Sequence, residues 1–335
     1  MISHNRQNSC NLRNETNNQA PIFRVMNKQL INREHSLYWM GIATLIILFL
    51  HCHNVNSSND SLNKLLGYVF TKGYLGVNIF IFLSAYGCCY SFNKNTLKQF
   101  YVNRVKRLYP TMLIFMIVSY FVTTPFRSTF LIDMLGHATG LALFFGGTVF
   151  ADWFVPFLSL MYICFPIIYK VTSWLYDRGT IWVAIAVIIP SFLIFIPVFY
   201  PFIFTLTLPR IGMILLGIVV YLAEQKKEIT KLAGICIPLT LISFTKIIDS
   251  AFLACPVIIL FASLCDMRLW GKKFLILVGK YSLEVYIAQC LFIWNFKDFG
   301  ENPVLATCVL LLVIIAASCV LGLIHKYFWK FINHS

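Results

Sequence analysis

The first apolar run of the chain ends in a histidine that could carry acid–base chemistry. This run extends from Leu37 to His51. An ionisable side chain at membrane depth marks a candidate functional site, and the imidazole of His51 could remove a proton from a hydroxyl group that attacks an acyl carbonyl. The alternative is a histidine that only reaches toward the membrane interface, and its position alone does not separate the two interpretations.

Two arginines form the second candidate site. Arg104 and Arg107 belong to a basic cluster that contains no acidic residue and comprises Lys94, Lys98, Arg104, Lys106 and Arg107. Residues three apart share one face of a helix, so the two guanidinium groups could together bind a phosphate-bearing ligand. The alternative is that this charge only keeps the segment on the cytoplasmic side of the membrane.

Polar and aromatic residues in two later segments could line a cavity between helices. In DWFVPFLSLMYICFP, Trp153 is typical of a membrane interface, and Tyr162 could form a hydrogen bond inside a helical bundle. In GKYSLEVYIAQ, Gln289 lies within an apolar segment, where a side-chain amide needs hydrogen-bond partners. Taken alone, the first segment is ordinary membrane packing. For the second, the simplest interpretation is an ion pair at the interface between Glu284 and Lys280, four residues earlier.

The elements that must position these residues are membrane helices. The chain has 335 residues, of which 59% are hydrophobic and 12% charged, whereas a soluble domain has about 25% charged residues. Cytoplasmic loops that attract anionic lipid explain the net charge of +14 better than nucleic-acid binding does. The eleven cysteines lie mostly inside apolar runs without C-x-x-C spacing, so we expect no metal site.

The order of apolar and basic segments predicts an all-α integral membrane protein. Residues 1–35 form a polar tail, which we expect to be cytoplasmic and disordered, and residues 36–335 form one membrane domain. Eleven apolar segments are visible, but eleven crossings would place three basic segments on the outer side. The segment Phe130–Ala151 contains Asp133, His137 and four glycines, and a re-entrant or interfacial course for it removes the conflict.

We therefore predict a bundle of about ten transmembrane helices plus one re-entrant or interfacial segment. Both termini would lie in the cytoplasm, and the protein would reside in the plasma (inner) membrane. A competing explanation is that two of the later apolar segments are misassigned, because helix boundaries are the least reliable part of such a prediction.

Five segments, in this order, resemble membrane-bound acyltransferase family 3, a group of integral-membrane O-acyltransferases that mostly modify bacterial surface sugars. The similarity covers the chain from about Leu37 to Phe331, and GVNIFIFLSAYG is most similar to the polysaccharide O-acetyltransferase-like subgroup. The five segments are Gly41–His51, Gly76–Gly87, Arg104–Pro110, Trp153–Pro166 and Gly279–Gln289.

The resemblance implies a role for each candidate residue. His51 would be the catalytic base, and Arg104 and Arg107 would bind the acyl-CoA donor, with acetyl-CoA as a co-substrate and no tightly bound cofactor. The acceptor would be a hydroxyl group of a cell-surface carbohydrate or a lipid-linked glycan. The residues expected to line the cavity on the acceptor side are Asn78, Ser84, Trp153, Tyr162, Ser282, Tyr286 and Gln289.

The chain also departs from the family pattern. Met40 stands where the family usually has Arg or Lys, eleven residues before His51, and Gln289 stands where His is common. Asn78 replaces a common acidic residue, and Ala85 replaces the usual Gly. Two alternatives therefore stay open, a catalytically degenerate family member and a transporter or flippase for a glycan precursor.

Overall fold

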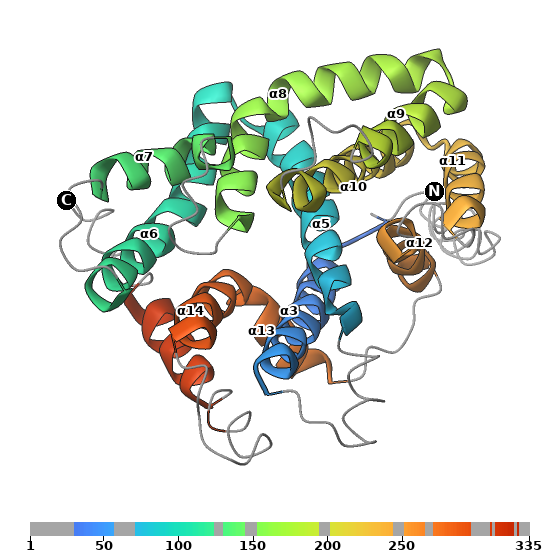
Figure 1. The fold of residues 1–335 in the computed structure, drawn as a ribbon. Coiled ribbons are helices and arrows are strands. Elements are labelled where there is room, and N and C mark those ends of the chain that lie inside the picture. The colour runs from blue at the N-terminus through green and yellow to red at the C-terminus, as the bar shows by residue number, and fades with distance from the viewer. Residues whose placement is uncertain are drawn as a thin grey trace, which may run out of the picture.

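The computed structural model describes residues 30–56, 71–123, 130–144, 153–193, 202–243, 251–264, 271–295, 309, 312–324 and 327. These ranges contain helices and turns and no strand, so the predicted all-α class is confirmed (Figure 1). The longer helices are α3 (Arg33–Asn56), α5 (Leu75–Lys94), α6 (Leu97–Thr123), α8 (Phe154–Arg178) and α10 (Phe202–Lys226). The shorter ones are α7 (Phe130–Thr139), α9 (Thr180–Phe192), α11 (Ile229–Ser243), α12 (Ala251–Leu264), α13 (Lys272–Lys280), α14 (Ser282–Asn295) and a helix over Leu312–Ile324. Two 3-10 turns, η1 (Thr71–Tyr74) and η2 (Leu141–Leu143), accompany them.

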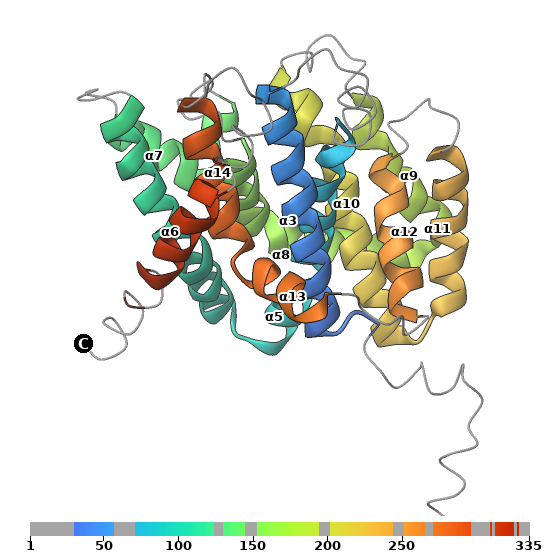
Figure 2. The ribbon, with the colours of Figure 1, turned by 90° about the horizontal axis from the view of Figure 1, so that it is seen from below.

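Most of these helices run side by side, and several of the turns between them lie at one end of the bundle (Figure 2). At this end α3 begins, α5 turns into α6, α10 turns into α11, and α13 lies across the bundle. We call it the basic end because its turns and α13 carry Lys94, Lys98, Lys226, Lys227, Lys272 and Lys273. The opposite end is called the far end. Along α3, His51 lies eighteen residues beyond Arg33, which is about 27 Å toward the far end.

Within the described ranges, three helical stretches are long and apolar enough to cross a membrane: Leu75–Lys94, Phe154–Arg178 and Thr207–Lys226. Shorter apolar helices cover Thr180–Phe192, Ile229–Ile242 and Leu312–Ile324. Large apolar side chains on the outside of the bundle, such as Ile167 and Trp182, are exposed, as expected for contact with lipid. The chain is therefore a membrane protein, and the number of ten crossings stays a prediction.

The segment that we expected not to cross contains the short helix α7. Its ten residues span about 15 Å, half of the thickness of a bilayer core. Leu131 and Ile132 on its surface are exposed, while His137 is buried. This geometry agrees with a re-entrant or interfacial course as far as Phe144, and residues 145–152 lie outside the described ranges.

Helix α3 is held against α13 by a reciprocal pair of glycines. A Cβ atom on Gly41 would lie 2.0 Å from the carbonyl oxygen of Leu275, and one on Gly279 would lie 1.8 Å from that of Leu37. Only residues without a side chain allow the two backbones to approach this closely. Since α14 begins two residues after α13 ends, this contact also sets the position of α14 relative to α3.

Hydrogen bonds join α5 to α10 at the basic end. The hydroxyl groups of Tyr86 and Tyr90 both donate to the carboxylate of Glu224. The backbone N–H of Leu30 also donates to Glu224, at 3.4 Å, and both Leu30 and Ile31 are buried. Packing against the bundle therefore begins at or before Leu30, ahead of the predicted boundary at residue 36. Of the predicted tail, residues 1–35, the first 29 residues lie outside the described ranges.

Candidate functional site

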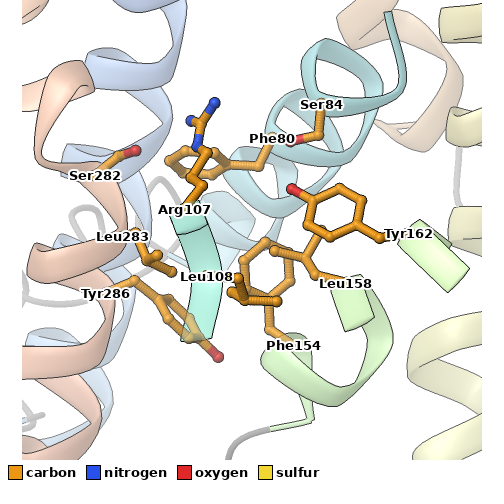
Figure 3. A pocket seen from close by; sticks show the side chains of 10 residues that line it. All are labelled: Phe80, Ser84, Arg107, Leu108, Phe154, Leu158, Tyr162, Ser282, Leu283 and Tyr286. Carbon is orange, nitrogen blue, oxygen red and sulfur yellow. The ribbon is translucent and has the colours of Figure 1, made fainter. Parts of the chain in front are cut away.

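A pocket opens between α5, α6, α8 and α14, the helices that carry most of the candidate residues (Figure 3). Its lining consists of Phe80, Ser84, Arg107, Leu108, Phe154, Leu158, Tyr162, Ser282, Leu283 and Tyr286. Five of these were predicted as site residues from the sequence, namely Ser84, Arg107, Tyr162, Ser282 and Tyr286. The structure thus brings together residues that are separated by up to about 200 positions in the chain.

The part of the pocket nearest the basic end is polar and positively charged. Arg107 is exposed and its guanidinium group reaches this part of the pocket (Figure 3). The hydroxyl groups of Ser84 and Tyr162 lie near each other on one wall of the pocket, and Ser282 is buried on the opposite wall (Figure 3). One exposed cation beside several hydroxyl groups can bind an anionic ligand that enters from the basic end.

Arg104 lies next to this pocket but does not line it. Its guanidinium carbon lies 5.5 Å from the ring centre of Phe100 and 5.6 Å from that of Tyr162. One terminal nitrogen donates to the Sγ atom of Cys88 at 3.5 Å, and the buried Nε atom has no hydrogen-bond partner. The two arginines share a helix, as expected, but Arg104 is held between aromatic rings while Arg107 reaches the opening.

His51, the predicted catalytic base, lies further toward the far end of the bundle. The side chain of His51 lies beside the side-chain amide of Gln289. The Oε1 atom of Gln289 is buried and has no hydrogen-bond partner, so it accepts no hydrogen bond from the imidazole in this structure. His51 and Gln289 therefore meet between α3 and α14, which pack directly against each other.

One face of α14 connects the two places. Ser282, Tyr286 and Gln289 follow one another at intervals of four and three residues, so they lie on the same face of the helix. Ser282 and Tyr286 line the pocket, and Gln289 contacts His51. The seven residues from Ser282 to Gln289 span about 10 Å. A row of polar side chains thus leads from the positively charged pocket to the imidazole.

Two of the predicted cavity residues lie elsewhere. Asn78 is fully buried, and neither its amide nitrogen nor its amide oxygen has a hydrogen-bond partner. Trp153 precedes α8 and does not line the pocket. Its ring lies 4.7 Å from the guanidinium carbon of Arg210, a residue of α10 that is only 3% exposed.

Some residues around the site were missed in the sequence analysis. Arg210 could have been found, because a charged residue inside an apolar run is a functional candidate by default. Cys88, the partner of Arg104, and the pocket residues Phe80 and Phe154 carry no comparable signal, because they read as ordinary apolar residues of membrane helices.

Comparison with known families agrees with the resemblance found in the sequence. A family model described as an acyltransferase domain, that of acyltransferase family 3, matches residues 39–323. The match includes His51, both arginines and the whole of α14. No curated protein and no solved structure matches the chain.

Proposed function

The chain belongs to acyltransferase family 3, and we propose that it transfers an acetyl or other short acyl group from acyl-CoA to a carbohydrate hydroxyl. The donor would be acetyl-CoA, and the acceptor a cell-surface or lipid-linked glycan. The observation that carries this proposal is the polar face of α14, which joins a pocket with an exposed Arg107 to the His51–Gln289 pair.

The donor would enter from the basic end. Coenzyme A carries several phosphate charges and cannot cross lipid, so its binding site should be basic and open to the cytoplasm. On this proposal the basic end faces the cytoplasm, and the cytoplasmic position of both termini in the plasma membrane stays a prediction. Arg107 would contact a phosphate directly, and Arg104 would add positive charge from its place between Phe100 and Tyr162.

Transfer then requires one base. His51 takes the proton from the acceptor hydroxyl as its oxygen attacks the thioester carbonyl, the carbon–sulfur bond breaks, and the imidazolium returns the proton to the departing thiolate of CoA. The distance of about 10 Å from Ser282 to Gln289 is within reach of an extended pantetheine arm. General base catalysis of this kind typically contributes a factor of about 10² to 10⁴ in rate.

Met40, where the family usually has a basic residue, is buried with 5% exposure. It faces no solvent and contributes no charge, so donor binding in this chain would depend on Arg104 and Arg107. A Met40→Lys variant provides a way to separate an active enzyme from a degenerate one. In an active enzyme the added lysine changes an existing rate, whereas in a degenerate protein the rate stays at zero.

The proposal is tested with membranes that contain the protein and matched membranes that lack it. Both are incubated with acetyl-CoA labelled in the acetyl group, and the glycan fraction is examined for label and for the mass increment of acetylation. We expect labelled glycan only where the protein is present. Translocation of a glycan precursor without any acylated product would favour the transporter alternative and overturn the proposal.

A further inference from the structure

Three aromatic rings from three different helices meet in the part of the pocket that lies away from the basic end. The ring of Phe154 lies 4.9 Å from that of Tyr286 and 6.3 Å from that of Phe80, measured between ring centres. We call these three residues the aromatic layer. All three line the pocket. The rings of Phe154 and Tyr286 make an edge-to-face contact at 62°, and those of Phe80 and Phe154 are tilted by 60°.

The aromatic layer lies between the polar part of the pocket and His51. Helices α5 and α8 run toward the basic end, whereas α14 runs away from it. In each helix the aromatic residue is one or two turns further from the basic end than a polar lining residue: Phe80 relative to Ser84, Phe154 relative to Tyr162, and Tyr286 relative to Ser282. Gln289, the contact of His51, is one turn beyond Tyr286. In Figure 3 the rings of Phe154 and Tyr286 lie at the opposite end of the pocket from the guanidinium group of Arg107, and the ring of Phe80 lies closer to Arg107.

We infer that Phe154 determines acyl-group specificity, through the width of the passage that the aromatic layer leaves. This inference rests on the proposed function, because an acyl group has to pass the aromatic layer to reach His51. The ring of Phe154 is 5% exposed and is enclosed by Phe80 and Tyr286, so it has little freedom to move aside. Narrow linear acyl groups pass it, and branched ones of the same carbon count are rejected.

Two isomeric acyl-CoA donors test the effect of the width of the acyl group separately from the effect of its hydrophobicity. Butyryl-CoA and isobutyryl-CoA carry the same number of carbon atoms and differ in branching. The wild type, Phe154→Ala and the control variant Phe157→Ala are supplied with each donor in membranes, and the transfer rates are compared. Phe157 is a suitable control because it lies on the same helix with the same 5% exposure, contacts Trp153 and does not line the pocket.

We expect Phe154→Ala to raise the ratio of isobutyryl to butyryl transfer about tenfold. This is the low end of the rate differences that an apolar pocket makes between substrates differing by one methylene group. The ratio should stay unchanged in Phe157→Ala. An unchanged ratio in Phe154→Ala, or an equal change in both variants, overturns the inference. Should Phe154→Ala be absent from membranes, Phe154→Leu, which keeps an apolar side chain, is used with the same criterion.

The wild type separates this inference from the proposed function. If it transfers no acyl group from any donor, the proposed function has failed. The aromatic layer is then tested by binding, through the thermal stabilisation of the purified protein by each of the two donors. Preferential stabilisation by butyryl-CoA that Phe154→Ala removes supports the inference, and equal stabilisation by both donors overturns it.

Discussion

The imidazole of His51 on α3 meets the side-chain amide of Gln289 on α14. These residues are 238 positions apart in the chain, and the contact depends on how closely α3 packs against α13 and α14. Gln289 is also the residue that places His51 next to the polar face of α14.

Replacing His51 by alanine should reduce acyl transfer by about 10² to 10⁴-fold, because the acceptor hydroxyl loses its general base. The measurement is the rate of glycan acylation per amount of protein in the membrane. His35→Ala serves as the control, since His35 lies on the same helix near the basic end. Near-normal product formation by His51→Ala would exclude the base role.

Gln289 should act as a positioning residue for His51. We expect Gln289→Ala to lower kcat about tenfold, the effect of one hydrogen bond of about 1.4 kcal/mol that the amide would form with the imidazole in the reacting complex, while the KM for acyl-CoA stays the same. Gln289→His should restore the rate, because an imidazole can also hydrogen-bond His51. A rise in KM with unchanged kcat would instead assign Gln289 to substrate binding.

Arg107→Ala should raise the KM for acyl-CoA by roughly tenfold or more, since a hydrogen bond to a charged group contributes about 1.5 to 3 kcal/mol. The effect should shrink at high salt, because Arg107 is exposed and its charge is screened. Lys98→Ala is the matched control, as Lys98 is an exposed cation on the same helix that does not line the pocket. Equal KM values for Arg107→Ala and Lys98→Ala would remove Arg107 from the donor site.

Gly279→Ala should destabilise the protein, since the new Cβ would collide with the Leu37 carbonyl oxygen. Overpacking of this kind typically costs about 1 to 3 kcal/mol. Gly234→Ala on α11 is the control, because a Cβ there meets no atom within 4 Å and alanine favours a helix over glycine. Thermal unfolding in detergent should show a lower Tm for Gly279→Ala alone, and equal Tm values would contradict the close approach of α3 and α13.

Glu228, between α10 and α11, should make the stability of the protein depend on pH in acid. The neighbouring hydroxyl group of Tyr176 and the charge of Lys231 hold the pKa of Glu228 below its ordinary value of 4.5. A lowered pKa contributes stability above the unfolded value, and this contribution is lost as the pH falls through the folded value. Glu228→Gln should therefore lower the Tm at pH 7 but not well below pH 4. A Tm difference that persists in acid would exclude this cause.

The sequence alone was sufficient for the class of protein and for its family. Helices produce local patterns, namely apolar runs and basic flanks, so the all-α membrane fold could be predicted. The re-entrant or interfacial course of Phe130–Ala151 stays a prediction. The family follows from five ordered segments and is confirmed by the match over residues 39–323. His51, Arg104 and Arg107 were singled out because charged and ionisable residues are conspicuous in an apolar chain.

Only the tertiary structure determined where each of these residues lies relative to the pocket. Arg104 and Arg107 are equivalent in the sequence pattern. In the structure, Arg104 lies between two aromatic rings, whereas Arg107 lines the pocket. In the sequence, Phe154 is not distinguishable from the other apolar residues of its segment. In the structure, its ring contacts those of Phe80 and Tyr286. Contacts between distant helices depend on side-chain packing and on close approaches at glycines, and neither leaves a local pattern in the sequence.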